Sequence, residues 1–148
     1  MKIEQALKDI LIGGKIGNGC YRDVYQCKLD YGLVVKIEKE GGQFHNIKEW
    51  NIWEEVKYSP LKKWFAPCVS ISDDGTILIQ KKIELGRKKD YPKKVPSFFT
   101  DIQTHNFGFI GKQLVCCDYG STIITRSFND KNLKIADWKI GKTRVLNN

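Results

Sequence analysis

The sequence lacks the features that mark membrane and secreted proteins. None of its apolar runs approaches the roughly 20 residues that span a bilayer. Residues 1–14 carry acidic side chains and do not follow the basic-then-apolar layout of a cleavable signal. With 148 residues, 41% of them hydrophobic and 28% charged, the composition is that of one ordinary globular domain. We therefore expect a soluble, cytoplasmic protein.

Metal-binding and disulfide patterns are also missing. The chain has five cysteines and two histidines, and no C-x-x-C occurs. Because the cysteine count is odd and Cys116 is adjacent to Cys117, the pattern favours neither a disulfide framework nor a zinc site. Reduced thiols in the core or in a pocket are the favoured interpretation.

Positive charge is in excess, with 25 Lys and Arg against 17 Asp and Glu and a net charge of +8. This excess favours an anionic ligand, which could be a nucleotide, a nucleic acid or an acidic partner. The densest basic cluster lies in residues 81–94 and is either a solvated connector or a surface that docks a protein partner. Direct nucleic-acid binding is the weakest alternative, because Trp50, Trp53 and Trp64 have apolar neighbours typical of a core.

Hydrophobic periodicity and turn residues predict an α+β fold, with an antiparallel sheet of about five strands and one helix packed on it. Helical patterns occupy residues 3–11 and 44–58. Strand patterns with turn signals between them occupy residues 12–16, 23–29, 33–38, 67–72 and 76–82, and a short appended hairpin occupies 107–110 and 113–117. Residues 121–148 support no assignment.

Two segments carry a first indication of chemistry. Gly17, Asn18 and Gly19 join the first two predicted strands, and glycines in such a turn let backbone N–H groups approach phosphate oxygens. Lys36 follows in a β-branched run, and a buried lysine needs an anion beside it. Glu49 or Glu54, in the helix that follows, would supply the carboxylate.

The order of these segments resembles the protein-kinase family, in which a glycine-rich loop precedes a strand lysine and then a helix glutamate. Further along, Asp101 and Asn106 have the Asp-x4-Asn spacing of a kinase catalytic loop, and Asp118-Tyr119-Gly120 stands where kinases carry Asp-Phe-Gly. The small size is similar in style to kinase-like proteins of bacteriophages, for which the host cytoplasm and a host protein partner would be expected.

The resemblance implies a role for each of these residues. ATP and Mg²⁺ would be the cofactors, Lys36 would contact the phosphates, and Glu49 would hold Lys36, with Glu54 as the alternative. Asp101 would accept or orient the hydroxyl proton. The remaining implied contacts are phosphate binding by Gly17, Asn18, Gly19 and Arg22, adenine binding by Val24, Cys117 and a hinge at residues 81–85, and Mg²⁺ binding by Asn106 and Asp118.

The chain also departs from the kinase pattern. Arg22 stands at the third-glycine position, Phe99-Thr100 replaces His-Arg before Asp101, and nothing after Gly120 matches Ala-Pro-Glu or leaves room for a large helical lobe. We expect one truncated domain, with a small-lobe-like part at 1–85, a basic connector at 86–97, the catalytic-loop hairpin at 98–120 and a tail at 121–148. A phosphotransferase acting on a protein, on itself or on a small molecule, and an inactive kinase-like module that inhibits a host macromolecule, both stay open.

Overall fold

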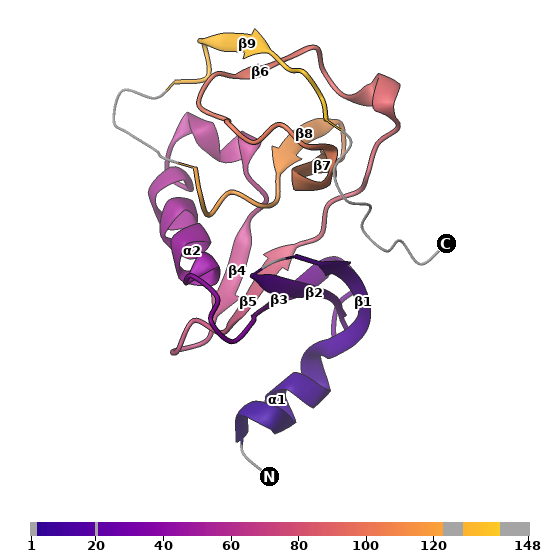
Figure 1. Ribbon diagram of the computed structural model, residues 1–148, viewed down its shortest axis with the longest axis vertical. Helices are drawn as coiled ribbons and strands as arrows, with labels where there is room; N and C mark the ends of the chain where they lie inside the picture. The colour runs from indigo at the N-terminus through magenta and orange to yellow at the C-terminus, as the bar shows by residue number, and fades with distance from the viewer. Residues whose placement is uncertain (1–2, 20, 123–128, 140–148) are drawn as a thin grey trace.

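The chain folds around a five-stranded antiparallel sheet with the strand order β1-β2-β3-β5-β4 (Figure 1). The computed structural model describes residues 3–19, 21–122 and 129–139. The sheet strands are β1 (Ile12–Asn18), β2 (Arg22–Cys27), β3 (Leu33–Glu38), β4 (Cys68–Ile71) and β5 (Ile77–Lys81). The predicted α+β class, with five strands and a packed helix, is confirmed.

The turn between β2 and β3 is longer than predicted. The second strand ends at Cys27, because Asp30 organises the residues that follow. The Asp30 carboxylate accepts a hydrogen bond from the Gly32 N–H at 2.7 Å, and the Asp30 carbonyl accepts one from Leu33 at 3.1 Å. Such Asx-type bonding favours a turn over a strand. β3 begins at Leu33, as predicted.

Helix α2 (His45–Val56) lies beside the sheet and is the element that brings a carboxylate to it. Its buried residues, Asn46, Glu49 and Val56, recur at helical spacing on one face. The carboxylate of Glu38, at the end of β3, accepts the Asn46 backbone N–H in the first turn. A negative charge at a helix N-terminus is stabilising, so the end of β3 also positions the start of α2.

The predicted hairpin is present as β7 (Phe107–Ile110) and β8 (Gln113–Cys116). Its turn contains Gly111 with a positive φ of 62°, a conformation that favours glycine. The aromatic core lies on this side of the molecule. Phe65, Phe99 and Phe107 form part of it, and the Phe99 ring contacts both of the others at centroid distances of 5.5 and 5.1 Å.

The basic connector and the tail pair with each other, which the sequence patterns did not indicate. A 3₁₀ turn at Lys88–Asp90 is followed by β6 (Lys94–Pro96), which runs antiparallel to β9 (Leu133–Ile135) at the end of the molecule opposite α1 (Figure 1). Val95 is fully buried. The connector thus contributes to the core, while its basic residues Arg87, Lys88, Lys89, Lys93 and Lys94 are exposed, as is Lys81 at the end of β5. Docking by these residues stays a prediction.

The N-terminal helix α1 (Ile3–Leu11) has the predicted bounds and projects from the sheet (Figure 1). It runs directly into β1, and the Leu11 carbonyl accepts the Lys28 N–H at 2.8 Å. Neither this helix nor α2, nor any other helix in the described ranges, is long and apolar enough to cross a membrane. The 3₁₀ turns Pro60–Trp64 and Thr104–Asn106 complete the described elements.

Trp138 attaches the segment after β9 to the core. Its ring contacts Tyr91 and Phe107 at centroid distances of 4.9 and 5.1 Å, and its indole N–H donates to the Pro92 carbonyl at 2.7 Å. We expect Trp138→Ala to lower the free energy of unfolding by about 2–3 kcal/mol, somewhat less than a fully buried Trp would cost. Urea denaturation would measure the loss.

The matched control is Ile135→Ala, in the neighbouring strand, whose side chain is 79% exposed. It should change stability by less than about 0.5 kcal/mol. Equal effects of the two substitutions would contradict the role assigned to Trp138.

Candidate functional site

Lys36 and Glu49 form a buried ion pair between the sheet and α2. Lys36 lies on β3, between Val24 of β2 and Leu78 of β5, and its side chain is only 3% exposed. Its ammonium lies 3.0 Å from Glu49 Oε2 and also donates to the backbone carbonyl of Cys117. Glu54 is instead paired with Lys57, so the structure selects Glu49 from the two predicted partners.

Arg22 is a second cation on the same carboxylate. Its side chain is 7% exposed, and Nη1 donates to Glu49 Oε2 and to Asn46 Oδ1, the latter at 3.1 Å. Nη2 donates to Asp118 Oδ1 at 2.9 Å. Arg22 therefore connects the start of β2, the inner face of α2 and the segment after β8.

Electrostatics keeps these groups ionised. Burial alone would raise the pKa of Glu49, but the charges of Arg22 and Lys36, with hydrogen bonds from Arg22 and the Tyr119 N–H, lower it to about 2. Burial alone would lower the pKa of Arg22, yet the charges of Glu49 and Asp118 raise it above its ordinary value. A fully buried carboxylate is tolerated here because two cations neutralise it.

The Asp118-Tyr119-Gly120 segment is held by contacts of the two residues that follow Asp118. The Tyr119 N–H donates to Glu49 Oε1 at 2.9 Å, and the Tyr119 hydroxyl donates to the Ala66 carbonyl at 2.8 Å and lies 3.1 Å from Cys68 Sγ. At Gly120, an added Cβ would lie 3.1 Å from the His45 carbonyl, so this segment approaches α2 closely. Asp118 itself is 45% exposed at its side chain, which leaves its carboxylate accessible.

Asp101 and Asn106 contact each other and connect to the same segment. Asn106 Nδ2 donates to Asp101 Oδ2 at 2.9 Å, and the Asn106 carbonyl accepts the Cys117 N–H at 2.8 Å. Asn106 is 2% exposed, and its side-chain oxygen Oδ1 is buried without a hydrogen-bond partner in the described part of the chain. A buried amide oxygen in this state is costly unless a ligand satisfies it.

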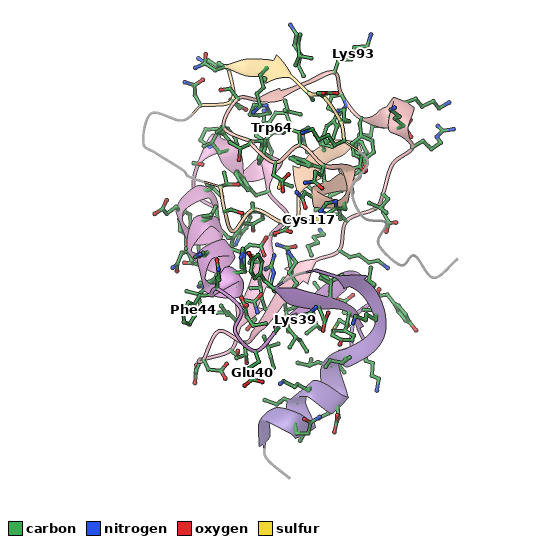
Figure 2. The ribbon with its side chains drawn as sticks, viewed as in Figure 1. Lys39, Glu40, Phe44, Trp64, Lys93 and Cys117 are labelled. Carbon is green, nitrogen blue, oxygen red and sulfur yellow. The ribbon has the colours of Figure 1, made fainter. Side chains whose placement is uncertain are left out.

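The remaining predicted contacts lie around this cluster. In the glycine loop, Gly17 pairs with Val24, and the Gly19 N–H donates to the Arg22 carbonyl at 2.9 Å. The backbone of Asn18 ends β1, while its side chain lies outside the described part, as does Cys20. In Figure 2, Cys117 lies between the five-stranded sheet and the β6–β9 pair.

In the predicted hinge, the backbone N–H groups of Ile83 and Leu85 donate to none of the residues described. The N–H groups of Lys82 and Glu84 donate to the carbonyls of Gly32 and Phe109, both at 2.8 Å. Ile83 also packs in one apolar cluster with Cys117, which places the hinge beside the residue that precedes Asp118.

Sequence reasoning assigned no role to two contributors. Asn46 accepts from Arg22 and donates through Nδ2 to the Lys36 carbonyl at 3.1 Å and the Thr76 carbonyl at 3.0 Å. The available signal was its spacing of three residues from Glu49, which places both on one helix face. Tyr21 stacks on His45 at 4.4 Å and 18°, and no local pattern indicates such a pair.

Comparison with known proteins adds little to this geometry. No protein-family model and no curated protein matches the chain. Among solved structures, it is similar to the ternary complex of streptomycin, ATP and the aminoglycoside phosphotransferase APH(2")-IIa, with 19% identity and a TM-score of 0.44. The match covers 59% of this chain and 30% of that one, well under two thirds of its length. At this level of similarity, nothing about activity follows from it.

The buried Glu49 carboxylate predicts a specific pH dependence of stability. Because the folded pKa of about 2 is below the ordinary 4.5, its contribution is complete above about pH 4.5 and is lost as pH falls toward 2. Glu49→Gln should cost about 3–5 kcal/mol at pH 7, since it leaves buried cations short of an anion. The difference in unfolding free energy between wild type and Glu49→Gln should become smaller as the pH falls. Urea denaturation between pH 7 and 2 would measure it.

Glu54→Gln is the control, because that carboxylate is 40% exposed. It should change stability by less than about 0.5 kcal/mol. If the difference in unfolding free energy between wild type and Glu49→Gln does not vary with pH, Glu49 is not the ionised centre of the cluster.

Proposed function

We propose that this chain is a kinase-like protein that binds ATP together with Mg²⁺. The observation that supports this most directly is the buried Lys36–Glu49 pair, with the Lys36 ammonium on the Cys117 carbonyl, one residue before Asp118. These residues are distant in sequence, and the fold brings them to one place. Buried ionised groups are costly, so retaining them favours use by an anionic ligand.

The residues present fit a magnesium ion. Mg²⁺ prefers oxygen ligands and usually keeps several waters, so one or two protein oxygens suffice. Asn106 Oδ1 is a buried oxygen without a partner among the described residues, and the Asp118 carboxylate is partly exposed. We propose that these two side chains hold the ion, whose charge would neutralise phosphate oxygens.

The adenine would meet the hinge. The Ile83 N–H is one of two hinge donors, with that of Leu85, that have no acceptor among the described residues, while Lys82 and Glu84 donate within the protein. Base recognition in clefts of this kind relies on a few placed polar groups among apolar ones, and Cys117 and Val24 would supply the apolar contact. Lys36 would contact the phosphates, with Gly17, Asn18, Gly19 and Arg22 around them.

Nucleotide binding is tested by thermal unfolding with and without Mg·ATP. A ligand specific to the folded state stabilises it by about 2.7 kcal/mol at 100 times its Kd, which raises Tm by several degrees. Wild type should show this shift, and Lys36→Gln should lose most of it. Lys15→Gln is the matched control, because Lys15 pairs with Asp23 on the sheet and touches neither Glu49 nor Asp118.

The absence of any wild-type shift at millimolar Mg·ATP would remove the nucleotide proposal. A shift of equal size in Lys36→Gln and Lys15→Gln would mean that ATP binds elsewhere.

We further propose that the bound ATP serves phosphate transfer, with Asp101 accepting the proton of the attacking hydroxyl. Asp101 is exposed, and the Asn106 and Gln103 amides orient its carboxylate at 2.9 and 2.7 Å. General-base catalysis contributes about 10²–10⁴-fold. Asp101→Asn should therefore reduce ATP turnover or autophosphorylation by at least about 100-fold while leaving the Mg·ATP thermal shift within a few tenths of a degree of wild type.

The turnover of wild type and Asp101→Asn would be measured with radiolabelled ATP. The purified protein would be assayed alone and with small-molecule or protein acceptors. Undiminished turnover in Asp101→Asn would exclude Asp101 as the base. No turnover in wild type, together with a normal thermal shift, would favour the alternative of an inactive kinase-like binding module.

A further inference from the structure

One oxygen of the Asp118 carboxylate is already occupied by a cation of the protein itself. Arg22 Nη2 donates to Asp118 Oδ1 at 2.9 Å, while Oδ2 has no partner among the described residues. The guanidinium is buried and cannot lose its charge at any ordinary pH. The charge that Arg22 places on Asp118 is therefore present at any ordinary pH.

Several contacts hold Arg22 in this place. Within the sheet, Arg22 pairs with Glu38, which itself caps α2. The loop before it is attached to the body of the protein by the Tyr21–His45 stack and by the Lys39 ammonium, which donates to the Gly19 carbonyl at 2.7 Å. Since both sides of Arg22 are restrained, the guanidinium is a preorganised part of the site.

The charges in the cluster sum to zero. Arg22 and Lys36 are balanced by Glu49 and Asp118, and each cation touches at least one of the carboxylates. In protein kinases, by comparison, two Mg²⁺ ions lie between the nucleotide and the Asp and Asn side chains. A divalent ion at Asp118 Oδ1 would lie directly against the Arg22 guanidinium, and like charges in contact repel each other.

Only one set of metal-binding oxygens remains free of that repulsive contact. Asn106 Oδ1 is buried without a hydrogen-bond partner in the described part of the chain, and the Arg22 contact on Asp118 is made at Oδ1 and not at Oδ2. Asn106 is connected to the segment through its carbonyl and the Cys117 N–H. These two oxygens could serve one ion, and Asp118 then has no further oxygen for a second one.

We propose that Arg22 takes the place of one of the two metal ions, so that the site binds nucleoside triphosphate with a single divalent cation. This inference rests on the proposed nucleotide binding and goes beyond it, because it makes Arg22 the residue that determines metal stoichiometry. Arg22 positions the Asp118 carboxylate and neutralises part of its charge. It therefore affects how many divalent cations the site binds and how tightly.

Counting Mn²⁺ ions tests this directly. Mn²⁺ accepts the same oxygen ligands as Mg²⁺, and its free form is quantified by electron paramagnetic resonance. Protein saturated with a non-hydrolysable ATP analogue would be titrated with Mn²⁺, and ions bound per protein–nucleotide complex counted. Wild type should saturate at one ion. Arg22→Gln, which removes the charge and keeps a polar side chain, should bind a second.

Lys15→Gln is again the matched control, because it removes one positive charge near the glycine loop without touching Asp118. It should keep one ion, which separates the local effect of Arg22 from a general change in charge. Arg22→Lys, which preserves the charge without the planar fork, should also keep one ion, and a second ion in this variant would contradict charge neutralisation at this position.

A wild-type count of two is decisive without the variants, whereas a count of one has to be compared with Arg22→Gln. Two ions in wild type, with the nucleotide bound, would overturn the inference and leave the proposed function intact. Failure of wild type to retain the analogue at any Mn²⁺ concentration would overturn the proposed function, and the inference with it. If wild type and Arg22→Gln both bind one ion, Arg22 does not limit the number of bound ions, and its proposed role is rejected.

Discussion

A single buried carboxylate, that of Glu49, holds the organisation of this protein together. It accepts hydrogen bonds from the Lys36 ammonium, the Arg22 guanidinium and the Tyr119 backbone N–H. These donors come from β3, the start of β2 and the segment after β8. Because the carboxylate is completely buried, these donors together offset its desolvation, and the two cations compensate its charge. The sheet, α2 and the β7–β8 hairpin are therefore fixed relative to one another.

Tyr119 links this polar cluster to the aromatic core. Its ring packs edge-on against Phe65 at 4.9 Å, and its hydroxyl reaches the Ala66 carbonyl, so the side chain is fully buried. Phenylalanine at this position would leave that carbonyl without its donor. Anchoring Tyr119 places its neighbour Asp118 at the boundary between the packed interior and solvent. A carboxylate at such a boundary can meet a ligand while its backbone stays rigid.

Arg22 is the largest chemical departure from the protein-kinase pattern, and its contacts explain how the departure is accommodated. A glycine at this position would leave Glu49 with one cation and Asp118 with none. Arginine supplies the missing charge from within the chain and joins the glycine loop to α2 through Asn46. Its planar fork reaches both carboxylates at once, which lysine could not do in the same way. The charges of Arg22, Lys36, Glu49 and Asp118 thus balance one another within the cluster.

Local sequence determined most of the secondary structure, because side-chain period and turn residues act over a few positions. The bounds of α1 and β3 and the three hairpins follow from such patterns. A β-branched run indicated Lys36, with Glu49 or Glu54 as its partner, whereas Asp118 was indicated only by the resemblance to protein kinases. Tertiary structure alone decided that Arg22 turns inward, that β6 pairs with β9 and that Trp138 packs on Tyr91. Such contacts join residues tens of positions apart, and their formation depends on packing and charge compensation in three dimensions, which no short-range periodicity encodes.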